Sequence, residues 1–221
     1  MKTLIRSLAK RALGLNSWNS DDDQQRLIPD AKVIFDVGAN VGQTAKTYRR
    51  LFPSSQIWSF EPFPASYAAL CSSLSDQKFH PVPIALSDRV GSSIFNIGAG
   101  SETNSLLHSY RETGETIEIQ TETIDHFCSE HGVPRIDILK VDAEGAEALI
   151  LKGAEEMFSH GAVRSVFVEV YFDPVYEGMP LMWDLHAQLK EVGFRLNGLY
   201  SLVSGRNGLL SYGNALYLHA D

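Results

Sequence analysis

The chain has 221 residues, which is enough for one large domain with a full hydrophobic core. Hydrophobic residues make up 44% of it and charged residues 21%, a composition that excludes a disordered, collagen-like or low-complexity protein. The formal net charge of −8 excludes nucleic acid as the principal partner, because binding to a phosphate backbone requires a concentrated positive field.

The first part of the chain differs in charge from the rest. Residues 1–20 contain four basic side chains and no acidic one, and the acidic residues that follow mark a break. Leu4, Leu8 and Leu15 recur at helical spacing between the basic residues, which predicts a basic amphipathic segment over residues 1–25 and a single domain over residues 26–221. We expect this segment either to pack on its own domain or to associate weakly with an anionic membrane surface.

Two features predict a cytoplasmic protein. The N-terminal segment lacks the continuous apolar stretch of a secretory signal or of a bilayer-spanning helix. Cys71 and Cys128 are the two cysteines, and a pair in a chain of ordinary composition predicts reduced thiols in the core rather than a disulfide framework.

Predicted strands and helices alternate along the rest of the chain. Apolar runs predict strands over residues 32–37, 56–61, 79–86, 136–141 and 163–170. Helical periodicity predicts helices over residues 43–51, 65–74, 124–131, 146–158 and 181–192. Strands that are apolar on both faces and alternate with helices are typical of a doubly wound α/β fold, with a mostly parallel sheet and helices on both faces.

Two later regions depart from this alternation. Residues 92–97 and 116–120 alternate apolar with polar side chains, which predicts an added antiparallel pair beside a long loop over residues 98–115. Residues 194–200 and 215–219 flank a turn rich in glycine, serine and asparagine, and they predict a closing hairpin.

A glycine loop of the form Asp-x-Gly-x-x-x-Gly follows the first predicted strand, from Asp36 through Gly38 to Gly42. Gly38 permits the backbone angles of a tight turn and leaves room for a ligand against the main chain. Ligands of open α/β sheets bind at this end of the strands. Asn40 occupies the place of the middle glycine in a dinucleotide-binding loop, so the loop suits a cationic amino-acid group better than a pyrophosphate.

The second predicted strand ends in an acid, Glu61, followed by Pro62. A carboxylate at this position can accept both hydroxyl groups of a ribose, as it does in dinucleotide-binding folds. A loop suited to an amino-acid group and a ribose-binding acid, on consecutive strands, together describe a site for S-adenosylmethionine.

The sequence resembles the FkbM-type family of class I, S-adenosylmethionine-dependent methyltransferases. The resemblance covers about residues 31–170, in the stretches 34–42, 60–62, 85–88, 123–125 and above all 138–147. Its most specific part is the run Lys-x-Asp-x-Glu-Gly-x-Glu, which begins at Lys140 and is present here without a gap.

This resemblance implies a seven-stranded Rossmann-like sheet and methyl transfer from S-adenosylmethionine to an oxygen of a sugar or of a polyketide-like natural product. In that arrangement the glycine loop faces the methionine part of the cofactor, Glu61 faces the ribose, and residues 85 and 86 face the adenine. The positions assigned to the cofactor are Asp36, Gly38, Ala39, Asn40, Gly42, Glu61, Pro62, Ala85, Leu86 and Asp142.

A second group of polar residues lies at the end of the fourth predicted strand. Lys140, Asp142 and Glu144 alternate along the chain and point to one face while it stays extended, and Glu169 ends the next strand. A hydroxyl group that attacks a methyl carbon needs a general base or a metal ion that lowers its pKa. We predict these four residues as the catalytic set. The three acids are also suited to one divalent cation, and helix capping is the structural alternative.

The predicted function is O-methylation of a small-molecule or glycan acceptor, on a hydroxyl of a sugar, a glycan or a glycosylated natural product. His108, in the predicted long loop, is a further candidate base. A nucleotide-dependent oxidoreductase is the first alternative, and Asn40 argues against it. A non-catalytic module that binds S-adenosylmethionine is the second, and the intact set of acids argues against that.

Overall fold

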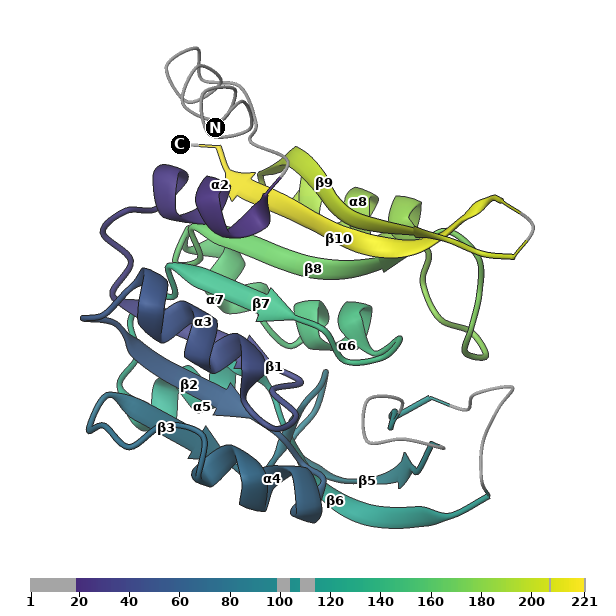
Figure 1. Ribbon diagram of the computed structural model, residues 1–221, viewed down its shortest axis with the longest axis horizontal. Coiled ribbons are helices and arrows are strands. Elements are labelled where there is room, and N and C mark those ends of the chain that lie inside the picture. The colour runs from purple at the N-terminus through teal and green to yellow at the C-terminus, as the bar shows by residue number, and fades with distance from the viewer. Residues whose placement is uncertain (1–18, 99–103, 108–113, 207, 221) are drawn as a thin grey trace, which may run out of the picture.

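The computed structural model describes residues 19–98, 104–107, 114–206 and 208–220. They form a seven-stranded sheet in the order β3-β2-β1-β7-β8-β10-β9 and a smaller three-stranded sheet (Figure 1). The strands of the large sheet are β1 (Val33–Val37), β2 (Gln56–Phe60), β3 (Phe79–Val82), β7 (Ile138–Val141), β8 (Ser165–Tyr171), β9 (Phe194–Ser204) and β10 (Leu210–His219). Strands β3, β2, β1, β7 and β8 are parallel, and β10 is antiparallel to both of its neighbours. The predicted mostly parallel, Rossmann-like sheet is confirmed.

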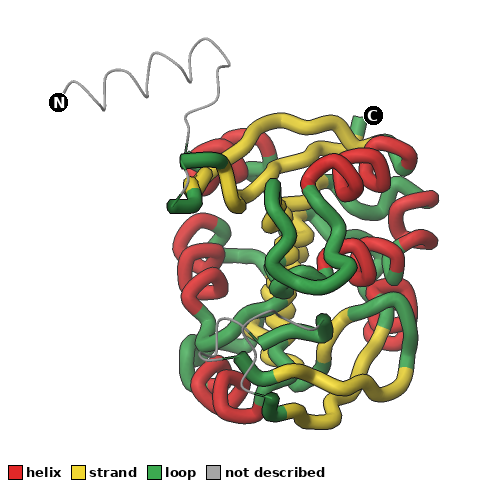
Figure 2. Tube along the Cα trace, turned by 90° about the vertical axis from the view of Figure 1, so that its right-hand side faces the viewer, coloured by secondary structure: helices red, strands yellow, loops and turns green. Residues whose placement is uncertain are grey.

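Helices cover both faces of the large sheet, as Figure 2 shows. Neighbouring residues of β1 illustrate why its sequence is apolar throughout: Ile34 belongs to the core on one face and Phe35 to the core on the other, and both are fully buried. One core includes residues of α2 (Ser20–Leu27), α3 (Gln43–Leu51) and α4 (Pro64–Cys71). The other includes residues of α5 (Ile124–His131), α6 (Glu147–Lys152), α7 (Glu155–Ser159) and α8 (Met182–Glu191).

The small sheet contains the predicted antiparallel pair, β5 (Gly91–Asn96) and β6 (Thr116–Glu122). Its third strand, β4 (Ala85–Leu86), pairs in parallel with β6, so the prediction of one continuous strand over residues 79–86 is wrong. Pro81 and Pro83 lack the N–H groups that a central strand requires, and β3 lies at the edge of the large sheet. The chain therefore leaves the large sheet after β3 and joins the small one.

The helix predicted over residues 146–158 is divided into α6 and α7. The chain turns at Gly153, where a Cβ atom would lie 2.1 Å from the carbonyl oxygen of Ser87. Only a glycine permits this close approach between the helical layer and the segment after β4. The predicted closing hairpin is confirmed as β9 and β10, and both strands are longer than predicted.

The acidic residues near the start of the chain begin a helix, α2, where the sequence predicted a break. The side chain of Asn19 caps it by accepting a hydrogen bond from the backbone N–H of Asp21 at 2.9 Å. Residue 25, the predicted end of the basic segment, lies inside α2. Residues 1–18, with their predicted membrane association, lie outside the described part of the chain. Within the described ranges, no helix is long and apolar enough to cross a membrane.

Candidate active site

A pocket of about 320 Å³ lies at the carboxyl ends of β1, β2 and β7, within the size range of roughly 300–1,000 Å³ that is usual for small-molecule sites. It brings together most of the predicted site residues, from strands that are distant in the sequence. The predicted residues that line it are Gly38, Ala39, Asn40, Glu61, Pro62, Ala85, Leu86, Lys140, Asp142, Glu144 and Glu169. Asp36 and Gly42 are not among the lining residues.

The glycine loop is packed between β2 and the end of β7. The backbone N–H groups of Gly38 and Ala39 both donate to the carbonyl oxygen of Phe60, at 3.1 and 3.0 Å. Gly38 has a φ of 72°, and a Cβ atom there would lie 1.8 Å from the carbonyl oxygen of Asp142. No other residue type fits this position, and the glycine leaves the main chain exposed to the pocket.

Gly42 is structural and does not contact the pocket, so its predicted cofactor contact is not supported. It has a φ of 89° at the start of α3, and a Cβ atom there would lie 2.4 Å from the Ser73 hydroxyl oxygen. The second glycine of the motif therefore permits α3 to pack against the end of α4.

Glu61 is held by the two segments that surround it. Its Oε2 accepts a hydrogen bond from the backbone N–H of Asn40 and its Oε1 accepts one from that of Phe63, both at 2.9 Å. Burial raises the pKa of Glu61, although these two N–H groups act in the opposite direction. Both oxygens retain lone pairs that can accept the hydroxyl groups of a ribose.

Two further observations show that this end of the pocket fits S-adenosylmethionine. The Oδ1 atom of Asn40 is buried and has no hydrogen-bond partner among the described residues, so it can accept a hydrogen bond from a ligand ammonium or hydroxyl group. The wall formed by Ile84, Leu86 and Phe95 is apolar and matches the flat face of an adenine. A cationic amino acid, a ribose and an adenine each have a suitable partner here.

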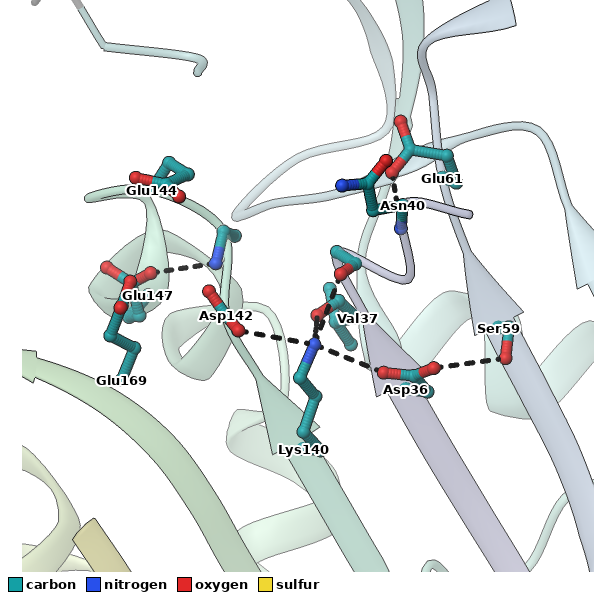
Figure 3. Close-up of polar contacts among 12 residues, drawn as sticks. Asp36, Val37, Asn40, Ser59, Glu61, Lys140, Asp142, Glu144, Glu147 and Glu169 are labelled. Carbon is teal, nitrogen blue, oxygen red and sulfur yellow. Dashed lines mark hydrogen bonds and ion pairs between the residues drawn. The ribbon is translucent and has the colours of Figure 1, made fainter. Parts of the chain in front are cut away.

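Lys140 and Asp36 form an ion pair beneath the glycine loop (Figure 3). The Lys140 ammonium lies 3.2 Å from Asp36 Oδ1 and donates to the carbonyl oxygens of Val37 and Gly38, at 3.2 and 3.1 Å. Asp36 is fully buried and does not line the pocket, and its carboxylate contacts the Lys140 ammonium. Burial acts to lower the pKa of Lys140, but the charges of Asp36 and Asp142 outweigh it and raise the pKa. Lys140 is a positioning residue.

Three carboxylates gather at the other end of the pocket. One oxygen each of Asp142, Glu144 and Glu169 lies within 4.8 Å of the other two. The Tyr176 hydroxyl donates to Glu144 Oε2 at 2.6 Å, and the Tyr171 hydroxyl contacts that oxygen at 3.1 Å and Glu169 Oε2 at 2.7 Å. Burial, together with the charges of Asp142 and Glu144, raises the pKa of Glu169 to about 9. Three of the four predicted catalytic residues thus lie close together at this end of the pocket.

Sequence reasoning missed the roles of Tyr171 and Tyr176. Their hydroxyl groups orient the carboxylates of Glu144 and Glu169. The Ser105 hydroxyl donates to the carbonyl oxygen of Glu144 at 2.6 Å and supports the φ of 52° at that residue. The available signal was that both tyrosines follow Glu169 closely in the sequence. His108, the further candidate base, lies outside the described residues.

The parallel sheet, the glycine loop at its ligand edge and the acid at the end of β2 define a Rossmann-like methyltransferase of class I. The chain belongs to the FkbM methyltransferase family, because the profile described as methyltransferase FkbM domain matches residues 36–196. The predicted S-adenosylmethionine-dependent methyltransferase is therefore confirmed at the level of the family. The comparisons do not favour a nucleotide-dependent oxidoreductase.

Known relatives agree with this assignment. The chain is 28% identical over 166 residues to 2-O-methyltransferase NoeI of Sinorhizobium fredii, covering 67% of this chain and 68% of NoeI. It is 27% identical over 170 residues to 31-O-demethyl-FK506 methyltransferase FkbM of Streptomyces tacrolimicus, covering 63% of this chain and 65% of that protein. Among solved structures, 1,6-didemethyltoxoflavin-N1-methyltransferase of Burkholderia thailandensis, with bound S-adenosylhomocysteine, shares the fold. Its TM-score is 0.51 at 11% identity, over 97% of this chain and 85% of that one.

Proposed function

We propose that the chain transfers the methyl group of S-adenosylmethionine to a hydroxyl oxygen of a sugar, a glycan or a glycosylated natural product. One observation carries this proposal: Asp142, Glu144 and Glu169 open into the same pocket as the glycine loop and Glu61. Groups that can accept a hydroxyl proton therefore adjoin the groups suited to the cofactor. Two relatives, 2-O-methyltransferase NoeI and 31-O-demethyl-FK506 methyltransferase FkbM, carry names that support transfer to oxygen.

Each part of the cofactor has a proposed partner in the chain. The backbone at Gly38 and the Oδ1 atom of Asn40 bind the methionine part, and Glu61 accepts the ribose hydroxyl groups. Ala85 and Leu86 contribute to the apolar surface for the adenine. When bound, S-adenosylmethionine supplies an electrophilic methyl group on a sulfonium centre.

Asp142 is the proposed general base for the acceptor hydroxyl. Its side chain is 39% exposed, whereas Glu169 is 9% exposed and is held by the Tyr171 hydroxyl. The Lys140 ammonium lies 3.6 Å from Asp142 Oδ2 and orients this carboxylate. Asp142 would take up the hydroxyl proton as the acceptor oxygen bonds to the methyl carbon and the carbon–sulfur bond breaks, which releases S-adenosylhomocysteine. Positioning of the two reactants would supply much of the rate enhancement.

The proposed acceptor is a small molecule or a glycan. The acidic net charge of the chain gives no attraction for a phosphate backbone, which argues against nucleic acid. We also propose a cytoplasmic location, supported by the fact that Cys71 and Cys128 are both free thiols.

The test combines cofactor binding with turnover. We expect calorimetry to show binding of S-adenosylhomocysteine, and a transfer assay with labelled S-adenosylmethionine to show methylation of at least one glycan or glycosylated acceptor. Asp142→Asn is expected to bind S-adenosylhomocysteine as the wild type does and to lose about 10²–10⁴-fold in kcat, the usual contribution of a general base.

Glu191→Gln, which alters an exposed carboxylate at the end of α8, is the matched control and should leave both quantities unchanged. Absence of a heat of binding with either S-adenosylmethionine or S-adenosylhomocysteine would contradict the proposed cofactor. Binding without turnover on any acceptor would favour the non-catalytic module instead.

A further inference from the structure

We infer that Asp142, Glu144 and Glu169 form a site for one hard divalent cation, such as Mg²⁺ or Mn²⁺, at the acceptor end of the pocket. One carboxylate oxygen of each residue lies within 4.8 Å of those of the other two. A cation that binds oxygen at roughly 2.0–2.6 Å can join three oxygens with this spacing. All three side chains line the pocket, so the cation would be accessible to a substrate.

A fourth carboxylate provides an independent indication of positive charge. Glu147 is 1% exposed, and its Oε1 accepts hydrogen bonds from the backbone N–H groups of Ala143 and Gly145, at 2.8 and 3.3 Å. Its Oε2 is buried and has no hydrogen-bond partner among the described residues. Figure 3 shows the Glu147 carboxylate next to that of Glu169. A buried carboxylate oxygen without a donor is costly unless the group takes up a proton or a positive charge lies nearby, and a cation at the cluster would supply that charge.

Among the described residues, the acceptor end of the pocket has more carboxyl groups than basic groups. The Lys140 ammonium forms ion pairs with both Asp36 and Asp142, at 3.2 and 3.6 Å, so its single charge is shared between two carboxylates. It also donates to two backbone carbonyl groups of the glycine loop. Lys140 cannot at the same time neutralise the remaining acids, and a divalent cation would balance them.

The ligand carboxylates are oriented before any cation binds. The hydroxyl groups of Tyr171 and Tyr176 contact Glu144 Oε2, and that of Tyr171 also contacts Glu169 Oε2. Carboxylates that bind metal ions usually have hydrogen-bonding partners of this kind, which fix their direction and preserve the geometry of the site. The two tyrosines therefore act as positioning residues for the cation.

The chemistry of the ligands selects the class of cation. Three carboxylate oxygens, with no nitrogen or sulfur ligand, favour Mg²⁺, Mn²⁺ or Ca²⁺ over zinc or copper. Its role rests on the proposed function: a cation here would bind the acceptor oxygen and lower the pKa of the hydroxyl group. The site itself follows from the carboxylates and can be tested without cofactor or acceptor.

The experiment titrates the full-length protein with Mn²⁺ and follows the sharp electron paramagnetic resonance signal of the free ion, which is lost on binding. We expect about one Mn²⁺ per chain, displaced by excess Mg²⁺. Glu144→Gln and Glu169→Gln should each weaken Mn²⁺ binding at least about tenfold, since even outer partners of a metal site contribute about 10–100-fold. Glu191→Gln, far from the cluster in the sequence and exposed on α8, should bind Mn²⁺ like the wild type.

Binding of S-adenosylhomocysteine, measured separately by calorimetry, shows that each variant is folded. It also distinguishes a failure of the proposed cofactor site from a failure of the proposed cation site. Should a variant not fold, the wild type alone still decides, because Mg²⁺ must raise its Tm with increasing concentration. The inference is wrong if the wild type leaves the Mn²⁺ signal unchanged. It is equally wrong if both Gln variants bind Mn²⁺ as tightly as the control, since the ion would then occupy another place.

Discussion

Asp36 and Lys140 occupy paired positions in the register of β1 and β7, and both are buried. The spacing in the sequence placed Lys140 with Asp142 and Glu144, and it indicated a catalytic lysine. The partner that changes this interpretation lies on a neighbouring strand that is distant in the sequence, so only strand pairing reveals it. At the residue scale, an ionisable group at a ligand edge acquires its role from the nearest opposite charge.

Removing Lys140 alone should be costly. Lys140→Met leaves Asp36 buried without its counter-charge, and breaking a buried ion pair costs roughly 3–5 kcal/mol. The double variant Lys140→Met/Asp36→Asn removes both charges and should recover part of that loss. Urea unfolding measures the difference. If the double variant is no more stable than Lys140→Met, the broken ion pair is not the cause of the lost stability.

The two glycines Gly38 and Gly132 provide a matched test of the cofactor loop. Both have positive φ values, 72° and 64°, so alanine strains the backbone at either position. At Gly38 the added Cβ would also lie 1.8 Å from the Asp142 carbonyl oxygen, whereas at Gly132 it meets nothing within 4 Å. Gly38→Ala should abolish binding of S-adenosylhomocysteine in calorimetry, and Gly132→Ala should retain it. Loss of binding in both variants would point to general destabilisation.

Helices α3 and α5 have the bounds that the sequence predicts, because their ends carry local signals. The Thr123 hydroxyl accepts a hydrogen bond from the His126 N–H at 3.1 Å and begins α5, and Gly132 ends it in the left-handed region. The division between α6 and α7 depends on the contact between Gly153 and Ser87, which no local pattern contains. At the element scale, ends set by neighbouring residues are predictable and ends set by distant ones are not.

The two cysteines differ in burial, and this difference tests the packing of α4 and α5. Cys128, on α5, is buried as predicted, and burial raises the pKa of its thiol to about 12. Cys71, at the end of α4, is exposed, so the prediction of two core thiols holds for one of them. Because the thiolate is the reactive form, we expect one thiol per native chain to react with a disulfide reagent at pH 8, and none in Cys71→Ser. Two rapidly reacting thiols per chain would contradict the burial of Cys128 on α5.

At the scale of the whole molecule, a hydrogen bond joins α2 to β9. The Tyr200 hydroxyl, on β9, donates to Asp23 Oδ2 on α2 at 2.9 Å, across 177 residues of sequence, and both residues are buried. The sequence indicated neither α2 nor this contact, since short polar helices have no apolar stripe. The parallel half of the sheet was predictable from its apolar strands, whereas this contact depends on polar groups that meet only after the chain has folded.

Tyr200→Phe tests this contact. The variant removes the hydroxyl group and keeps the ring, so the loss should be about 1.5–3 kcal/mol, the usual contribution of a hydrogen bond to a charged group. Tyr212→Phe, on the exposed part of β10, is the matched control and should leave stability unchanged. Urea unfolding of the two variants and the wild type gives the comparison. Equal stability of all three would mean that α2 contributes nothing through this bond.

Most of the candidate site was predictable because its residues end consecutive strands, and all parallel strands of a sheet end at one edge. Glu61, Asp142 and Glu169 were placed at that edge on this basis, and all three line the pocket. The sequence did not predict that Asp36 and Gly42 lie outside the pocket lining, because a residue at a ligand edge can point below the pocket as well as into it. Direction depends on the register and on packing between elements, and neither is visible in a motif.

The bonds between the Lys140 ammonium and the carbonyl oxygens of Val37 and Gly38 have a consequence for affinity. A loop that becomes ordered only when a ligand arrives loses conformational entropy at that moment, and this loss weakens binding. Here the loop is held by a lysine of β7, the strand that pairs with β1. Its conformational entropy is lost during folding, so the free energy of each ligand contact is available for affinity.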